Sequence, residues 1–240
     1  MFDHYFPSIL HFDAALAITL VTLGFIVFWA VVNNVFLVSR MTDRLGAEQA
    51  QESKIYLQRL VGVIGYGIIP ALVFFGGLGY KAADFGLAWQ WTLPDLWWTL
   101  GLSAVAVFLS YQGARKPESL TMYPEIRRPV WGQRTLIFSA LSWAAYLLAY
   151  ELTFRGFLLF SCERAFGAGA AIAINTAIYA LVHVPKRMTE GVGAIVLGLV
   201  LCFVTLQTGT IWVAVLVHIA LALSNEWFSL RLNPNIRYVP

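Results

Sequence analysis

A carboxylate and a guanidinium, those of Glu151 and Arg155, stand four residues apart in the apolar segment YELTFRG (150–156). On a helix, residues i and i+4 share one face, and Glu before Arg is the favourable order. Ionisable residues at membrane depth are costly and usually serve a function. The chemistry that a carboxylate offers here is general-base catalysis, in which it takes a proton from water. A structural ion pair that fixes helix packing is the alternative.

Two of the four histidines, His183 and His218, lie in later apolar runs. Each must face protein or a watery cavity rather than lipid. Upstream of His183, Asn175 and Tyr179 recur at intervals of four residues and form one polar stripe on a helix. Asn225 follows His218 by seven residues and therefore shares its helix face. Together with the Glu/Arg pair, these residues predict one shared site within the membrane.

Hydrolysis of a peptide requires a nucleophilic water and a stabilised oxyanion. We expect Glu151 to be the only glutamate in the interior of a span, which makes it the predicted general base, with Arg155 as its counter-charge. His183 and His218 are expected to position the water and donate to the oxyanion. Glu151 and the two histidines could equally bind zinc, because three protein ligands plus water form a catalytic zinc pattern. No His-Glu-x-x-His motif is present, and the metal-free interpretation is preferred.

The motifs around these residues resemble those of the CPBP family (CAAX protease and bacteriocin-processing, also called Abi), intramembrane proteases related to the eukaryotic CAAX prenyl endopeptidase. The motifs read Glu151-x-x-Phe154-Arg155-Gly156, then Tyr179-x-x-x-His183, then Thr208-Gly209-x-Ile211-Trp212 leading to His218. The resemblance covers roughly residues 135–230, and three motifs together are more specific than one. The resemblance implies an intramembrane endopeptidase that uses a glutamate and no metal ion.

Two positions depart from the family pattern. Family members usually carry two adjacent glutamates in the first motif, and the first is regarded as catalytic. Tyr150 stands at that position here, where it either donates a hydrogen bond or closes the site. Ala222 stands where the family has Asn or Asp, four residues after the third-motif histidine, and Asn225 is a candidate replacement.

Two classes of function follow. The first is an endopeptidase that cleaves near the C-terminus of a membrane-associated protein or peptide. The second is a pseudoenzyme that serves as a chaperone, assembly factor or accessory subunit of a membrane complex. The retained Glu, Arg and two His favour the endopeptidase, because a dead site has little physical reason to keep costly polar groups in lipid.

The composition is that of a polytopic membrane protein, with 59% hydrophobic and 12% charged residues and a mean hydropathy of +0.71. No basic helix or phosphate loop suggests nucleic-acid binding, so the expected partners are the lipid bilayer and a membrane-associated substrate. We expect an all-α fold, with a three-helix region and its cytoplasmic loops at 1–134 and the catalytic core at 135–240, in one membrane domain. The predicted spans are about 14–38, 55–79, 96–113, 135–160, 169–184, 191–208 and 211–230. The fourth could continue to about 166 as one long helix.

The basic residues predict the orientation. With seven spans, 13 of the 16 Lys and Arg residues fall on one side. The positive-inside rule then places the N-terminus outside and the C-terminus in the cytoplasm, and the membrane is expected to be the bacterial inner membrane. The loop at 114–134 carries five of these residues, either as ordinary positive-inside charge or as an interfacial element that contacts anionic lipid or guides a substrate tail. The 13 are Arg40, Arg44, Lys54, Arg59, Arg115, Lys116, Arg127, Arg128, Arg134, Lys186, Arg187, Arg231 and Arg237.

Overall fold

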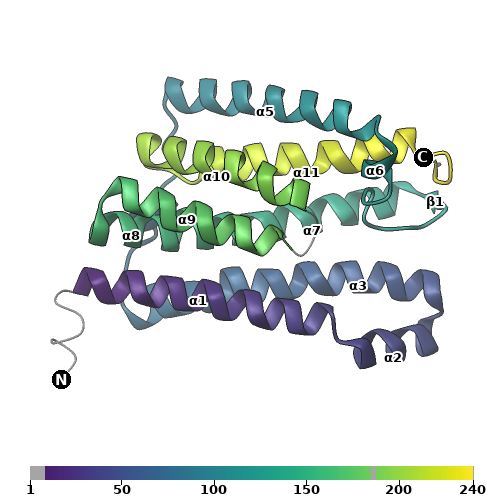
Figure 1. Ribbon diagram of the computed structural model, residues 1–240, viewed down its shortest axis with the longest axis horizontal. Helices are drawn as coiled ribbons and strands as arrows, with labels where there is room; N and C mark the ends of the chain where they lie inside the picture. The colour runs from purple at the N-terminus through teal and green to yellow at the C-terminus, as the bar shows by residue number, and fades with distance from the viewer. Residues whose placement is uncertain (1–8, 185–187, 240) are drawn as a thin grey trace.

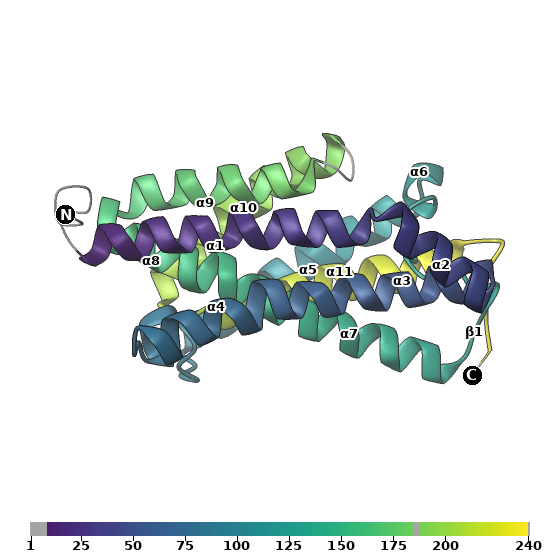
Figure 2. The ribbon, with the colours of Figure 1, turned by 90° about the horizontal axis from the view of Figure 1, so that it is seen from below.

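The computed structural model of the chain is a helical bundle with two very short strands (Figures 1 and 2). It describes residues 9–184 and 188–239, with the backbone alone at Leu10 and 188–190. Lys186 and Arg187, which entered the orientation argument, lie outside the described residues.

The longer helices are α1 (Ile9–Val32), α3 (Ala47–Gly62), α5 (Leu93–Ala114), α7 (Gln133–Glu151), α9 (Ala168–His183), α10 (Met188–Thr208) and α11 (Trp212–Leu232). The shorter ones are α2 (Val35–Leu45), α4 (Ile69–Ala71), α6 (Pro117–Leu120), α8 (Leu159–Phe166) and the 3₁₀ helix η4 (Ala82–Phe85). The π-helical stretches are η2 (Val63–Ile68), η3 (Leu72–Gly77) and η5 (Leu152–Leu158). Strands β1 (Val130–Trp131) and β2 (Arg237–Tyr238) pair in parallel.

Among the described residues, six helical segments are long and apolar enough to cross a membrane. They are His11–Val32, Ala47–Gly77, Leu93–Ala114, Gln133–Phe166, Gly191–Thr208 and Trp212–Leu232. The prediction of an all-α, polytopic membrane protein is confirmed. The predicted fifth span is the shorter helix α9, whose 16 residues extend for about 24 Å. That length is less than the hydrocarbon core of about 30 Å.

The first predicted span, 14–38, is wrong at its C-terminal end. Helix α1 ends at Val32, and Asn34 caps the separate helix α2, because its side chain accepts a hydrogen bond of 2.9 Å from the N–H of Leu37. Asn is favoured as an N-cap because it satisfies a backbone N–H that the helix leaves open. The second helical segment begins at Ala47 rather than near 55, and the fourth continues to Phe166, which is the longer of its two expected ends.

Figure 1 shows α2, α6, β1 and the C-terminus at one end of the bundle. We name it the basic end, because α2 and the segment after α5 carry Arg40, Arg44, Arg115 and Lys116. Helices α3, α7 and α11 reach the basic end, whereas α9 ends and α10 begins well short of it. His183, the last residue of α9, therefore lies within the length of the bundle rather than at its end.

Helix α7 lies close to the segment that follows α3, because small residues meet there. A Cβ atom added to Gly67 would stand 2.8 Å from the Cβ of Ala149. Beside this contact, the hydroxyl of Thr153 in η5 donates a hydrogen bond to the carbonyl oxygen of Tyr66 in η2. Both segments are π-helical, a rare geometry that is frequent at functional sites. Together these contacts fix the turn of helix that carries the first motif.

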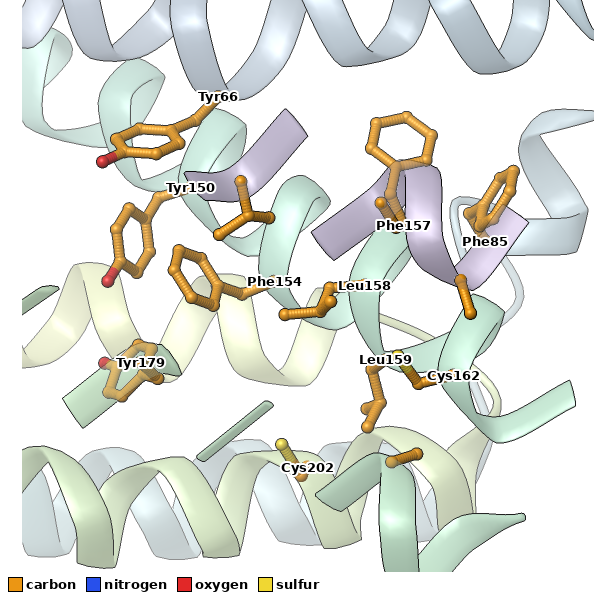
Figure 3. Close-up of a cluster of buried hydrophobic side chains, with 14 of the residues drawn as sticks. Tyr66, Phe85, Tyr150, Phe154, Phe157, Leu158, Leu159, Cys162, Tyr179 and Cys202 are labelled. Atoms are coloured by element: carbon orange, nitrogen blue, oxygen red, sulfur yellow. The ribbon is translucent and has the colours of Figure 1, made fainter. Parts of the chain in front are cut away.

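The main hydrophobic core consists largely of aromatic rings (Figure 3). Phe74 and Phe157 stack with their ring centroids 4.7 Å apart, and Phe85 packs edge-on against Phe157 at 4.8 Å. Tyr150 and Phe154 stack at 4.4 Å. Aromatic pairs of this kind contribute about 0.5–1.5 kcal/mol each beyond the burial of their area. The core thus includes Tyr150 and Phe154 of the first motif and packs around them.

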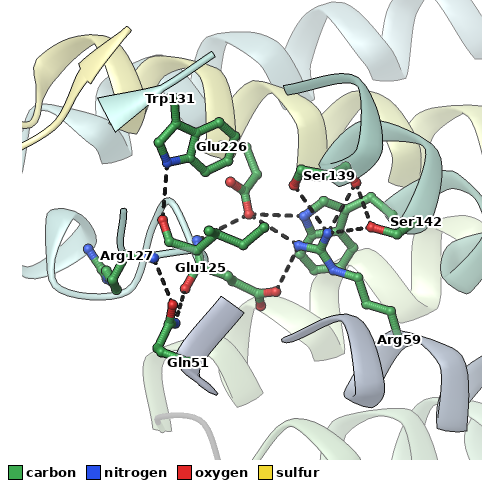
Figure 4. A network of polar contacts seen from close by, with 10 residues as sticks. Gln51, Arg59, Glu125, Arg127, Trp131, Ser139, Ser142 and Glu226 are labelled. Carbon is green, nitrogen blue, oxygen red and sulfur yellow. Dashed lines mark hydrogen bonds and ion pairs between the residues drawn. The ribbon is translucent and has the colours of Figure 1, made fainter. Parts of the chain in front are cut away.

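A cluster of buried charges lies at the basic end (Figure 4). Nη2 of Arg59 is 3.1 Å from Oε2 of Glu125 and 3.4 Å from Oε1 of Glu226, and the Arg59 guanidinium lies 4.3 Å from the centre of the Trp143 ring. Arg59 is only 3% exposed. Arg59 thus lies at the basic end, as expected, but inside the bundle on α3, where the carboxylates of Glu125 and Glu226 contact it.

Residues 115–131, which we name the cap, fold against the bundle through Glu125 and through contacts with α3. The side chain of Gln51 donates to the carbonyl oxygen of Glu125 at 2.6 Å and accepts from the N–H of Arg127 at 2.9 Å. Arg128 pairs with Glu52 at 3.0 Å. The backbone of Arg127 and the side chain of Arg128 thus bind protein groups, and the cap is an ordered part of the fold.

Candidate functional site

Glu151 is the last residue of α7, and its side chain has no exposed surface. Its Oε1 lies 2.5 Å from Nδ1 of His218 on α11, and its Oε2 lies 3.2 Å from Nη1 of Arg155 in η5. The carboxylate therefore stands between an imidazole and a guanidinium. A buried charge is tolerated only when it is paired, and this arrangement supplies one pairing for each carboxylate oxygen.

Arg155 is also without exposed surface, and its guanidinium carbon lies 4.2 Å from the centre of the Tyr179 ring. A guanidinium over an aromatic face is attracted by the negative charge of the ring face. The i,i+4 spacing of Glu151 and Arg155 brings them together as predicted, although η5 is π-helical rather than α-helical.

His183 lies at the C-terminal end of α9, and its Nδ1 is 2.7 Å from the carbonyl oxygen of Tyr179, one turn earlier. A carbonyl oxygen only accepts, so Nδ1 carries the proton and Nε2 is the acceptor nitrogen of the neutral ring. The rings of Tyr179 and His183 lie 4.6 Å apart. The backbone carbonyl and the ring of Tyr179 thus orient His183.

The ring of Tyr150 lies near both histidine rings. Its ring centroid is 6.2 Å from that of His183 and 5.9 Å from that of His218, with interplanar angles of 86° and 82°. The side chain is 4% exposed, and its hydroxyl has no hydrogen-bond partner within the described part of the chain. A buried hydroxyl without a partner costs about 1–3 kcal/mol.

A cavity of about 840 Å³ connects these residues with the basic end. Tyr150, Tyr179, His183 and His218 line it, as does Asn225. In the part of the chain that the structure describes, Glu151 and Arg155 do not line this cavity. Apolar side chains of α1, α5 and α10 form much of the wall, and residues of the cap and of the Arg59 cluster line its other end. The histidines thus reach the cavity, whereas the Glu/Arg pair lies behind them.

Asn175 takes a different place. Its amide donates to the carbonyl oxygen of Phe154 and accepts from the thiol of Cys202 at 3.2 Å. It is fully buried and is not among the described lining residues of the cavity. Asn175 therefore connects α9 to η5 and α10, and supports the first motif from behind.

The zinc alternative does not fit the arrangement of donors. One oxygen of Glu151 faces Nδ1 of His218 and the other faces Arg155, so the carboxylate and the imidazole are turned toward each other. In the part of the chain that the structure describes, no three His, Cys, Asp or Glu side chains form a group that could hold a metal ion.

Sequence reasoning missed a buried carboxylate on the last span. Glu226 on α11 is 4% exposed and accepts a hydrogen bond of 3.0 Å from the indole of Trp143. The expectation that Glu151 is the only glutamate inside a span is therefore wrong. Glu226 lies at the basic end with Arg59, and it supports the cap by accepting from the N–H of Glu125 at 3.1 Å.

Comparison with protein families matches residues 132–224 to the family described as Type II CAAX prenyl endopeptidase Rce1-like. The matched range contains both histidines and the Glu/Arg pair, whereas Asn225 lies just beyond it. Neither the curated proteins nor the solved structures gave a match. The family inferred from the motifs is confirmed for these residues. Over residues 132–224, the chain is similar to the Rce1-like type II CAAX prenyl endopeptidase family.

Proposed function

We propose that the protein is an intramembrane endopeptidase in which His218 takes a proton from water and Glu151 orients His218. The observation that carries the proposal is the 2.5 Å contact between Nδ1 and the buried Oε1. A carboxylate only accepts, so the neutral imidazole has its proton on Nδ1 and its lone pair on Nε2. The role expected for Glu151 thus passes to its partner, because Glu151 has no exposed surface and His218 lines the cavity.

In the proposed reaction, Nε2 of His218 takes one proton from water while the water oxygen bonds to the scissile carbonyl carbon. The carbonyl oxygen becomes an oxyanion. The C–N bond then breaks, and the leaving amine takes the proton from the imidazolium. Glu151 remains ionised and stabilises the imidazolium, as a carboxylate does in a catalytic triad. The match of this range to a protease family supports the proposal.

A membrane-associated protein or peptide with an apolar segment is the proposed substrate. The cavity has apolar walls on α1, α5 and α10 and the two histidines at one end. Such walls favour apolar groups, and a few polar groups then fix the orientation of the ligand. We place the basic end in the cytoplasm, and the protein in a bacterial inner membrane, on the strength of the basic residues.

The test is a comparison of membrane-protein termini in cells that produce each variant at an equal level. His218→Ala and His183→Ala should remove the protein-dependent cleavage products while the variants stay in the membrane. His11→Ala is the control, because its ring packs on Phe166 outside the site. Unchanged products in His218→Ala would refute the endopeptidase.

A pseudoenzyme is the second candidate, and Tyr150 favours it. The residue stands where the family carries its catalytic glutamate, and its ring lies 6.2 and 5.9 Å from the rings of His183 and His218. If Tyr150 closes the site, the native chain should cleave nothing, and Tyr150→Glu should create cleavage. The endopeptidase predicts cleavage by the native chain.

A further inference from the structure

The proposed reaction needs a hydrogen-bond donor where negative charge develops on the carbonyl oxygen. We propose that the hydroxyl of Tyr150 is this donor, so that the residue which replaces the family glutamate binds the substrate carbonyl. This inference rests on the proposed function for its catalytic part. Its binding part, a hydrogen bond from Tyr150 to a peptide carbonyl, stands on the geometry of the cavity.

Three observations place the donor. Tyr150 lines the cavity, although it is only 4% exposed. Its hydroxyl has no partner among the described residues, although buried hydroxyls are normally paired. Its ring lies about equally far from the two histidine rings, at 6.2 and 5.9 Å. A carbonyl bound between the histidines would therefore meet the phenol and give it the missing acceptor.

The ring is held from several sides, so the donor is fixed before substrate binds. Phe154 stacks on the Tyr150 ring at 4.4 Å, while Tyr66 and Tyr179 meet it edge-on at 5.5 and 5.7 Å. Figure 3 shows the hydroxyls of the three tyrosines on the same side of the cluster, away from Phe157. A donor fixed in this way needs no reorganisation during the reaction, which is what stabilises an oxyanion.

The chemistry balances without any further reactant. Tyr150 keeps its proton throughout and only shortens its hydrogen bond as the carbonyl becomes an oxyanion. The proton of the attacking water travels through His218 to the leaving amine. One peptide and one water thus give one acid and one amine.

The first arm of the test is kinetic. Tyr150→Phe retains the ring and removes one hydroxyl, and it should lower kcat by about 10²–10³-fold, the usual effect of losing one oxyanion donor. KM should change little, because the bond strengthens mainly in the transition state. Tyr56→Phe is the control, since Tyr56 packs in a separate cluster at the basic end. A Tyr150→Phe enzyme with the native kcat would overturn the proposal.

The second arm needs no turnover. The probe is an apolar tripeptide amide in which a ¹³C-labelled ketone replaces one peptide bond, bound to the purified protein in detergent. The ketone stretch should move to lower frequency in the native protein and return toward its value in apolar solvent in Tyr150→Phe. Equal frequencies in the two proteins, or no binding to the native protein, would overturn the inference.

The two arms separate this inference from the proposed function. If His218→Ala cleaves as the native chain does, or neither cleaves, the endopeptidase fails while a Tyr150-dependent ketone shift still supports the carbonyl site. If His218→Ala loses cleavage and Tyr150→Phe retains both cleavage and ketone shift, the endopeptidase stands and the donor role fails.

Discussion

Nδ1 of His218 and Oε1 of Glu151 lie 2.5 Å apart, although 67 residues separate them in the chain. This contact joins the end of α7 to α11 at a point where one partner is fully buried and the other reaches the cavity. Arg155 closes the far side of the carboxylate. The carboxylate can thus act on the cavity only through the imidazole, which determines what each substitution here should do.

Glu151→Gln should lower kcat by about 10²–10⁴-fold, the range for disabling general-base catalysis. An amide keeps the shape of the side chain but carries no charge to stabilise the imidazolium, and its NH₂ group can turn toward Nδ1 and impose the wrong tautomer. The measurement is the rate of substrate processing at equal protein level in the membrane. Glu163→Gln on α8 is the control, and full activity in Glu151→Gln would contradict the orienting role.

The orientation predicts the sidedness of four positions. Reporter fusions after residues 45, 85, 120 and 240 should read inside, outside, inside and inside, because basic residues gather at the end that carries α2 and the cap. A cytoplasmic signal at residue 85, in the loop before α5, would exclude this orientation. The prediction also requires α9 to cross, despite its 16 residues.

The sequence predicts the helices well, because long apolar runs can hide their backbone polar groups only as helices. It fails where a local signal overrides the hydropathy. The apolar residues after Asn34 continue the first run in composition, yet the Asn34 side chain caps a new helix. Hydropathy alone does not reveal such a cap.

The site was predictable to the extent that one helix determines it. The i,i+4 spacing brings Arg155 to Glu151, and the spacing from Tyr179 orients His183. A polar stripe on a helix shows which residues share a face, but it does not show which neighbouring helix that face contacts. The sequence therefore predicts Asn175 in the site, whereas its amide donates to the carbonyl oxygen of Phe154. That Glu151 lies behind His218 follows from packing between helices, which periodicity does not contain.

The Arg59 cluster was missed for the same reason. Its pairs are 66 residues apart for Glu125 and 167 residues apart for Glu226. Near the end of a span, such residues look like ordinary interfacial charges. Only the packing of α3, α7 and α11 shows that they meet.

Gly67→Ala should destabilise the protein by about 1–3 kcal/mol, the usual cost of overpacking. The added Cβ would stand 2.8 Å from the Cβ of Ala149 and push apart the two segments that hold the first motif. Thermal unfolding in detergent measures the effect. Gly76→Ala is the matched control, because no described atom beyond its immediate helix neighbourhood lies within 4 Å of a Cβ added there. Equal stability of the two variants would show that the close approach of Gly67 and Ala149 does not contribute to the free energy of unfolding.

Arg59→Met should destabilise the protein by about 3–5 kcal/mol, because removing one partner leaves the buried carboxylate of Glu226 without its counter-charge. Arg128→Met is the control: the Arg128 side chain is 38% exposed, and such surface pairs contribute about 0–1 kcal/mol. Combining Arg59→Met with Glu226→Gln should recover part of the loss, since the remaining amide carries no charge. Unfolding in detergent gives the stabilities, and cleavage of the cap by added protease should increase in Arg59→Met alone. If Arg59→Met matches Arg128→Met in both measurements, the buried cluster does not hold the cap in place.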